Sequence, residues 1–175
     1  MLPTLHTQRL TLRPWRADDA EFVWDMYSRP EVVRFLGRQP AVLTELAQAQ
    51  ARVAAWAAFE GPLHGTWAIV ATGRRAPVGT ALLKPLPSSG SGEPSGATEV
   101  GWHLHPNAWG NGYATEAGRR LLEHAWSHGL GEVFAVTYPQ NSASQAVCLR
   151  LGMTALGLTE DYYDLTCALF RAEPV

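Results

Sequence analysis

The residues most suggestive of chemistry lie in one stretch, Glu99 to Glu116, which reads EVGWHLHPNAWGNGYATE. Apolar and polar residues alternate up to Pro106, which predicts a strand, and a turn with Gly110 and Gly112 then precedes a helical pattern. The start of a helix presents unpaired backbone N–H groups and a partial positive charge, so it attracts anions such as phosphate. Glycine lets phosphate oxygens approach the backbone because it lacks a Cβ. The stretch is therefore a candidate phosphate-binding loop.

The two best-known phosphate motifs do not fit this turn. A nucleotide P-loop needs Gly-Lys followed by Ser or Thr, and no lysine follows Gly112. A dinucleotide fingerprint needs a small third residue after a strand, whereas Thr115 occupies that position and the preceding strand lies far from the N-terminus. On these residues alone, a turn with a purely structural role remains the alternative.

The hydrophobic pattern predicts the elements that would position this loop. Strands are predicted over 9–14, 66–72, 77–86, 98–105, 132–138, 153–159 and 162–171. Helices are predicted over 18–29, 42–59, 110–128 and 141–151, with a short helical or irregular turn over 31–37. The strands over 98–105 and 132–138 should pair in parallel through a right-handed crossover. This order predicts an α/β or α+β domain, with a mixed sheet and helices on both faces.

Length and composition exclude several classes of protein. The 175 residues are 46% hydrophobic with a formal net charge of −2, which is typical of one domain spanning residues 1–175 rather than a disordered chain. The Ser/Gly/Pro-rich segment 87–97 is predicted to be a mobile loop, too short to separate two domains. There is no basic excess for nucleic acid, and no apolar run approaches the ~20 residues of a membrane span. The N-terminus lacks the apolar core of a signal peptide, so a reduced, cytoplasmic protein is predicted.

Residues around the loop carry a family resemblance. The run WGNGYATE from Trp109, with Pro106 before it, resembles the acetyl-coenzyme A pyrophosphate loop of the GNAT superfamily of N-acetyltransferases. Asn141-x-x-Ser144, followed by LRLGM at 149–153, is similar to the second motif of that superfamily. The segments TxRLxLR at 7–13 and PEVxRFLG at 30–37 are similar to the opening of its ribosomal-protein N-terminal acetyltransferase (Rim-type) branch.

This resemblance implies a fold and an activity. The implied fold is a mixed, mostly antiparallel sheet of about seven strands flanked by about four helices, with a splayed parallel pair in the centre. The implied activity moves an acetyl group from acetyl-CoA to a primary amine, by direct attack in a ternary complex. A protein or peptide N-terminal amine is the first expectation for the acceptor, in a monomer or homodimer. The alternatives are a small-molecule amine, such as an antibiotic or amino acid, and a non-catalytic module that senses acyl-CoA.

The resemblance also assigns residues to the cofactor. The backbone around 103–105 would pair with the pantetheine arm, and the N–H groups of the glycine turn would hold the pyrophosphate. The expected cofactor-binding residues are Leu104, His105, Trp109, Gly110, Asn111, Gly112, Tyr113, Ala114, Thr115, Asn141 and Ser144. Two positions depart from the family pattern: Asn107 replaces a common Gln or Arg, and His103 replaces a common aromatic.

Three residues are candidates for proton transfer. Ser144 matches a family position that protonates the departing thiolate, although serine is also a favoured helix cap, as is Asn141. Glu99 and His103 share one strand face, so either could take the proton of the amine, Glu99 through a water. A carboxylate beside an apolar core has a raised pKa, which suits a base. An α-amine has a pKa near 8 and is partly neutral at pH 7, so a strong base is not required.

The remaining predictions concern the acceptor and two less favoured chemistries. The acceptor pocket is expected between the first helices and the last hairpin, with the aromatic candidates Trp24, Phe35, Tyr162 and Tyr163, which could equally be core residues. Cys148, one turn after Ser144, could carry the acetyl group, but a buried inert thiol is the commoner state. His124 and His128 have i, i+4 spacing without a third ligand, so no metal is expected and both are predicted to lie at the surface.

Overall fold

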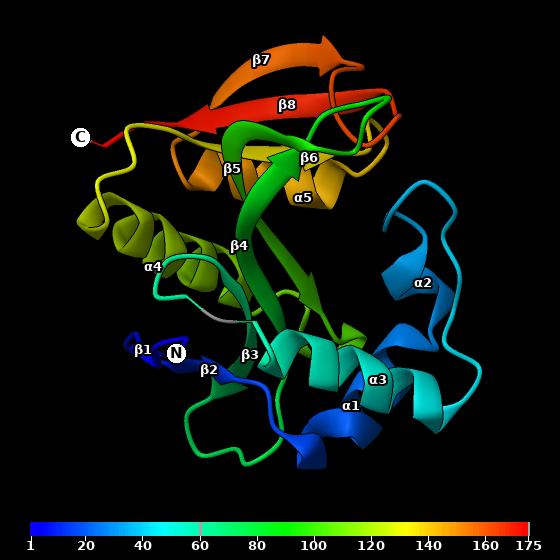
Figure 1. The fold of residues 1–175 in the computed structure, drawn as a ribbon. Coiled ribbons are helices and arrows are strands. Elements are labelled where there is room, and N and C mark those ends of the chain that lie inside the picture. Colours follow the sequence, from blue (N-terminus) through cyan, green and yellow to red (C-terminus); the bar gives the residue numbers. More distant parts are fainter. Residues whose placement is uncertain (60, 175) are drawn as a thin grey trace.

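The computed structural model describes residues 1–59 and 61–174 and is drawn in Figure 1. Its strands are β1 (Leu5–His6), β2 (Leu10–Pro14), β3 (Gly65–Ala71), β4 (Gly79–Pro87), β5 (Pro94–Leu104), β6 (Val133–Thr137), β7 (Thr154–Thr159) and β8 (Cys167–Ala172). Its α-helices are α1 (Ala20–Tyr27), α2 (Pro30–Val33), α3 (Leu46–Ala57), α4 (Tyr113–Ser127) and α5 (Ser142–Arg150). Short 3-10 turns precede α1 and follow β5, at Ala17–Asp19 and Pro106–Ala108. Over these described residues, no helix is both long and apolar enough to cross a bilayer.

The strands form one mixed sheet in the order β1-β2-β3-β4-β5-β6-β8-β7. Neighbouring strands are antiparallel except β5 and β6, which run parallel and pair at Glu99 and Phe134. Across the described chain the register of this pair stops there, so the two strands separate toward the end of β5. The mixed, mostly antiparallel sheet with a splayed parallel pair in its centre confirms the predicted fold class.

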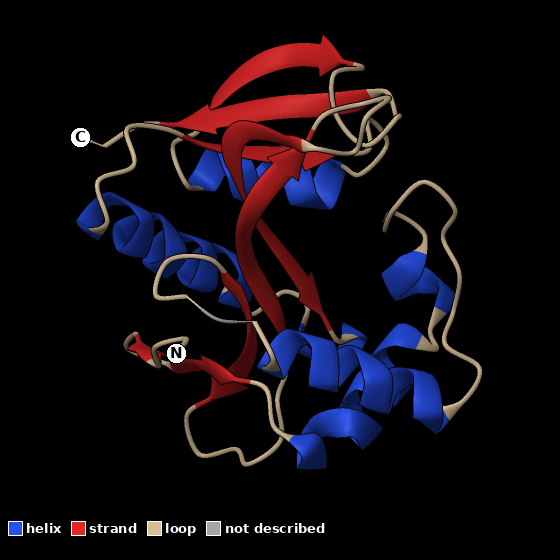
Figure 2. Cartoon of the chain, viewed as in Figure 1, coloured by secondary structure: helices blue, strands red, loops and turns tan. Residues whose placement is uncertain are grey.

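Helices cover both faces of the sheet because strand side chains alternate between the faces. On β3, Trp67 and Ile69 belong to the core that α4 covers, whereas Ala68, between them, packs with the core of α1 and α3. Figure 2 shows α1, α2 and α3 grouped together, apart from α4 and α5. A buried ion pair anchors the α1 side, since Arg13 Nη1 lies 2.7 Å from Asp19 Oδ2.

Predicted and observed elements differ most around the last hairpin. The strand expected over 162–171 begins only at Cys167, because Tyr163 and Asp164 adopt left-handed φ angles of 61° and 54°, which a strand does not allow. The loop expected over 87–97 ends earlier, since β5 begins at Pro94. The rest of that loop contacts the turn before β8: Ser89 Oγ donates to Glu160 O at 2.6 Å.

Three smaller differences concern short elements and one histidine. β1 is too short for periodicity to reveal, whereas α2 is the short helical turn expected over 31–37 and begins one residue earlier, at Pro30. Both raise the number of elements above about seven strands and four helices. His128 is exposed as predicted, but His124 is buried, with Nε2 2.9 Å from Pro62 O. The surface position predicted for His124 is therefore wrong, because the segment before β3 covers this side of α4.

Candidate active site

The glycine turn between β5 and α4 has the backbone geometry that an anion site requires. Gly110 and Gly112 both adopt a φ of 76°, a left-handed conformation that glycine enters without strain. Gly112 is the N-cap of α4, and residues 109–112 are exposed. The first N–H groups of a helix have no partner within the helix, so those of Tyr113, Ala114 and Thr115 remain available. The turn therefore offers backbone donors and a helix end to a phosphate.

The N-terminal TxRLxLR segment at 7–13 stabilises this turn through side-chain contacts. Arg9 Nη2 lies 2.6 Å from Glu116 Oε2, and Arg9 Nη1 donates to Asn111 O at 3.1 Å. Thr7 Oγ1 donates to Glu116 Oε1 at 2.6 Å. Partial burial opposes ionisation of Glu116, but these hydrogen bonds from Thr7 and Arg9 outweigh it and keep its pKa below the usual value. Thr7 and Arg9, which sequence analysis singled out only as a family motif, thus fix the first turn of α4.

Two side chains of the turn stabilise its own backbone. The Trp109 indole Nε1 donates to Leu104 O at 2.9 Å, and its ring is about half exposed. Asn111 Nδ2 donates to Ala108 O at 3.1 Å and Trp109 O at 3.0 Å. Both residues therefore shape the loop through their side chains, and their backbone groups stay at its surface.

The separation of β5 from β6 opens a cleft with a volume of ≈ 90 Å³. It brings together five of the predicted residues: Phe35, Glu99, His103, Asn141 and Ser144. Its other walls come from Leu36, Leu82, Val100, Gly101, Trp102, Ala135, Val136 and Thr137. The cleft thus joins the α2 side of the sheet to the start of α5.

The backbone of β5 presents free groups to this cleft. Just after β5, the His105 N–H donates to the O of Val78, just before β4, at 3.0 Å, and in an antiparallel pair such bonds recur at every second residue. Odd-numbered residues of β5 therefore bond to β4, whereas Trp102 and Leu104 direct their N–H groups toward the separated β6. The Leu104 carbonyl already accepts from Trp109, so a ligand in the cleft would meet Trp102 and the Leu104 N–H.

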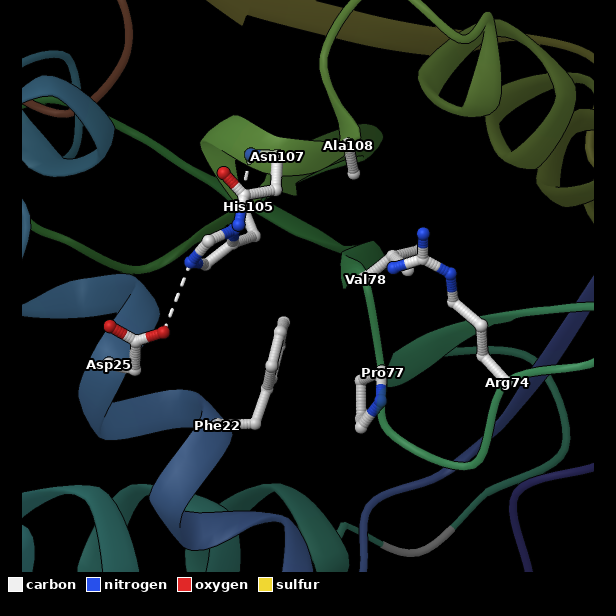
Figure 3. Close-up of a pocket in the computed structure, with 8 residues that line it drawn as sticks. All are labelled: Phe22, Asp25, Arg74, Pro77, Val78, His105, Asn107 and Ala108. Carbon is white, nitrogen blue, oxygen red and sulfur yellow. Dashed lines mark hydrogen bonds and ion pairs between the residues drawn. The ribbon is translucent and has the colours of Figure 1, made fainter.

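His105, predicted to lie beside the cofactor, does not line the cleft. Its backbone N–H bonds to Val78 O just before β4, its Nε2 lies 3.1 Å from Asp25 Oδ2, and its Nδ1 accepts from Asn107 N–H at 3.2 Å. Figure 3 shows the pocket that His105 lines instead, where the Asp25 carboxylate faces it from α1. This pocket measures ≈ 190 Å³ and also includes Phe22 and Arg74. His105 therefore joins α1 to the end of β5.

Glu99 lies buried where β5 and β6 part. Its Oε1 is 3.3 Å from Lys84 Nζ on the neighbouring strand, and Lys84 also lies over the Tyr163 ring, 5.3 Å from its centroid. The Tyr163 hydroxyl is buried without a hydrogen-bond partner of standard geometry in the described chain. It is nevertheless close enough to Glu99 to lower the pKa of that carboxyl. Burial raises the pKa of Glu99 above its usual value, and Lys84 and Tyr163 offset part of that rise.

A buried tyrosine, Tyr27, forms a hydrogen bond with the His103 ring. His103 Nδ1 lies 2.8 Å from Tyr27 Oη, which also contacts Thr80 Oγ1 at 2.9 Å. Burial lowers the pKa of His103 to about 4, and the charges of Lys84 and Arg52 contribute. The imidazole is therefore neutral at physiological pH and a weak base.

At the start of α5, the helix cap and the residue that faces the cleft are two different polar residues. Asn141 is the N-cap, since its side chain accepts from Ser144 N–H at 3.2 Å. Ser144 therefore does not cap the helix and is half-buried in the cleft wall. Cys148 is fully buried one turn later, and burial raises the pKa of its thiol to about 12. A protonated, buried thiol is a poor nucleophile, so the geometry disfavours the acetyl-cysteine route.

The predicted aromatic residues occupy different places. Phe35 is in the cleft wall, with its ring 5.7 Å from that of Tyr138. Tyr163 lies beside Glu99, whereas Tyr162 forms an isolated bridge with Ser88. Trp24 is 40% exposed on α1 and is absent from the cleft lining. The structure thus brings Phe35 and Tyr163 toward the cleft but neither Trp24 nor Tyr162.

Four residues around the cleft are not evident from the sequence: Tyr27, Arg52, Thr80 and Lys84. Lys84 could have been predicted, because the register of the β4–β5 pair places it opposite Glu99. The other three depend on how α1 and α3 pack on the sheet, for which a single sequence carries no direct signal.

Comparisons with known proteins identify the class. The chain matches the family model described as an acetyltransferase (GNAT) domain over residues 9–154. It is 34% identical to the FsC-acetyl coenzyme A-N(2)-transacetylase of Aspergillus fumigatus, over 93% of this chain and 69% of that protein. It is 28% identical to the uncharacterized N-acetyltransferase YoaA of Bacillus subtilis, over 93% and 89% of the two chains. The solved acetyltransferase of Agrobacterium tumefaciens has a TM-score of 0.77 at 27% identity and covers 99% of this chain and 96% of that one.

The fold, the loop before α4 and the open sheet together define an acetyl-CoA-dependent N-acetyltransferase. The chain belongs to the GNAT acetyltransferase family, and acetyl-CoA is its acetyl donor. The residues fit that donor. The backbone N–H groups of the glycine turn suit a phosphate, and unpaired backbone groups of β5 face the cleft. The fold is also that of RimL, a ribosomal L7/L12 α-N-protein acetyltransferase solved with coenzyme A, at a TM-score of 0.77 and 16% identity.

Proposed function

We propose that this enzyme acetylates an α-amine, in the first place that of a protein or peptide N-terminus, as in the Rim-type branch. The observation that carries this proposal is the weak basicity of the cleft. His103 has a pKa of about 4, and Lys84 and Tyr163 offset part of the burial-driven rise in the pKa of Glu99. At pH 7 an α-amine is neutral roughly 10²–10³ times more often than a lysine side chain, given pKa values near 8 and 10.4. A site with little basicity suits the acceptor that needs the least help.

The cleft supports direct transfer between two substrates bound together. Acetyl-CoA supplies the acetyl group as a reactive thioester. The N–H groups of residues 110–115 would hold its pyrophosphate, and the free backbone of Trp102 and Leu104 would hold its pantetheine arm. Glu99 would accept the amine proton, through a water, from the α2 side of the cleft. Ser144 would give a proton to the leaving sulfur from the α5 side.

A small-molecule amine is the second candidate acceptor. The relative at 34% identity is named for transfer to an N(2) nitrogen of FsC, and this chain aligns with it over most of its length. A name that specifies one nitrogen of one acceptor supports this second candidate. The two candidates share the same cleft and the same proton transfers, so they differ in what surrounds the amine.

Release of free thiol from acetyl-CoA tests the proposal. The acceptors are peptides with a free N-terminus and no lysine, the same peptides with a formylated N-terminus and one lysine, free amino acids, aminoglycosides and polyamines. We expect release with free N-termini and none with formylated peptides. Release with lysine or polyamines alone would contradict an α-amine acceptor, and release with amino acids or aminoglycosides alone would favour the second candidate. Tight acetyl-CoA binding with no release anywhere would favour the sensor module.

Glu99→Gln should lower kcat/KM about 100-fold at pH 7, the lower end of the usual 10²–10⁴-fold contribution of a general base. The deficit should shrink as the pH rises past the pKa of the acceptor amine, because the acceptor then arrives neutral. Full pH profiles of the variant and of Glu93→Gln, an exposed carboxylate in the turn before β5, would measure this. A deficit that stays constant from pH 6.5 to pH 9 would show that Glu99 does not accept the proton.

A further inference from the structure

Arg52 on α3 lies near the cleft and forms no ion pair with any described residue. Arg52 projects from α3 over the Tyr27 ring, with Cζ 4.8 Å from the ring centroid, and lies 5.9 Å from that of Trp56. None of the ion pairs of the described residues includes Arg52, and it is partly exposed. Stacking on two aromatic rings holds a guanidinium in place while its N–H groups stay free for a ligand.

Arg52 is linked to the cleft through one aromatic ring. The hydroxyl of Tyr27 lies 2.8 Å from His103 Nδ1, and His103 lines the cleft. The charges of Arg52 and Lys84 both contribute to the lowered pKa of His103, so both cations act on the space where the acceptor would enter. Glu99 offsets Lys84, whereas Arg52 has no ion-pair partner among the residues that the structure describes.

We infer that Arg52 selects acceptors that carry an anionic group close to the reacting amine, so that the preferred substrate is an acidic peptide N-terminus. This inference rests on the proposed function and specifies its substrate class. A carboxylate on the acceptor would form charge-assisted hydrogen bonds with the Arg52 guanidinium. The Tyr27 ring separates Arg52 from His103 in the cleft wall. Because an extended peptide covers about 3.5 Å per residue, the anionic group must lie within roughly the first three residues of the acceptor.

The same charge explains why a weakly basic cleft suffices. A nearby cation lowers the pKa of an amine, because it disfavours the ammonium form. The carboxylate of the acceptor would compensate for this repulsion during binding, whereas a polyamine, with further positive charges, would meet it without compensation. Arg52 therefore favours acidic α-amine acceptors over polycationic ones.

The test is a peptide series that places one aspartate at position 1, 2 or 3, each matched by an asparagine peptide of the same length. We expect wild-type kcat/KM to favour the aspartate peptide about tenfold at one position at least, mainly through KM. Arg52→Gln should remove this preference, so that the aspartate and asparagine peptides of each pair react with the same kcat/KM. Arg52→Lys should restore part of it, because the charge returns without the planar fork.

The control variant is Arg75→Gln, which removes an exposed arginine in the turn between β3 and β4 and should leave the preference intact. Equal rates for aspartate and asparagine peptides at all three positions would overturn the inference and leave the α-amine proposal standing. A preference that persists in Arg52→Gln would also overturn it. No turnover of any peptide with a free N-terminus would instead overturn the proposed function, and the inference with it.

Discussion

Gly112→Asp is expected to weaken acetyl-CoA binding at least about 100-fold, a loss of about 2.7 kcal/mol. The substitution sets a side chain and a negative charge at the N-cap of α4, where the pyrophosphate would meet the backbone N–H groups. Like charges in close contact cost several kcal/mol. The new Cβ would lie 3.5 Å from Arg9 Nη2, an ordinary contact, so the loop has room for the residue.

Isothermal titration with acetyl-CoA measures this loss, and Gly129→Asp is the matched control. Gly129 follows the other end of α4 with a φ of 83°, and a Cβ there would meet nothing within 4 Å. Both variants therefore impose similar left-handed strain, about 1 kcal/mol, and should melt at similar temperatures. Affinity should fall in Gly112→Asp and stay at the wild-type value in Gly129→Asp. Undiminished binding by a folded Gly112→Asp protein would remove the loop from the cofactor site.

The loop, the two strands beside it and the start of α5 could be predicted because their signals are local. Gly112 stands one residue before a helical pattern, and Asn141 and Ser144 have the three-residue spacing of a cap and the N–H it accepts. The order of these elements and one crossover rule then imply a parallel central pair. The free backbone of Trp102 follows from register, which a sequence does not state.

The parts that could not be predicted depend on packing between distant segments. Tyr27 meets His103 across 76 positions of sequence, because α1 packs against the face of β5 that carries His103. Tyr27 is buried, and its hydroxyl contacts His103 in the cleft wall. His105, two residues after His103, also faces α1, but it contacts Asp25 and lines a different pocket. A shared strand face is therefore a weak guide to function where a strand ends.

Ser144→Ala is expected to lower kcat about 100-fold, or about 2.7 kcal/mol of transition-state stabilisation, with acetyl-CoA affinity unchanged. Ser144 lies in the cleft wall and does not cap α5, since Asn141 does, so its removal should leave the helix intact. A departing thiolate that lacks a positioned proton donor must be protonated by water, which raises the barrier to its departure. The loss should therefore appear in kcat rather than in KM for acetyl-CoA.

Steady-state thiol release, with the best acceptor and saturating acetyl-CoA, measures this effect. Ser142→Ala is the control, because Ser142 opens the same helix but is exposed and absent from the cleft lining. A kcat within threefold of wild type in Ser144→Ala would mean that the leaving sulfur obtains its proton elsewhere. A 100-fold loss in Ser144→Ala with full activity in Ser142→Ala would exclude a general weakening of α5. It would also exclude the sensor module, since a protein without turnover has no rate for Ser144 to support.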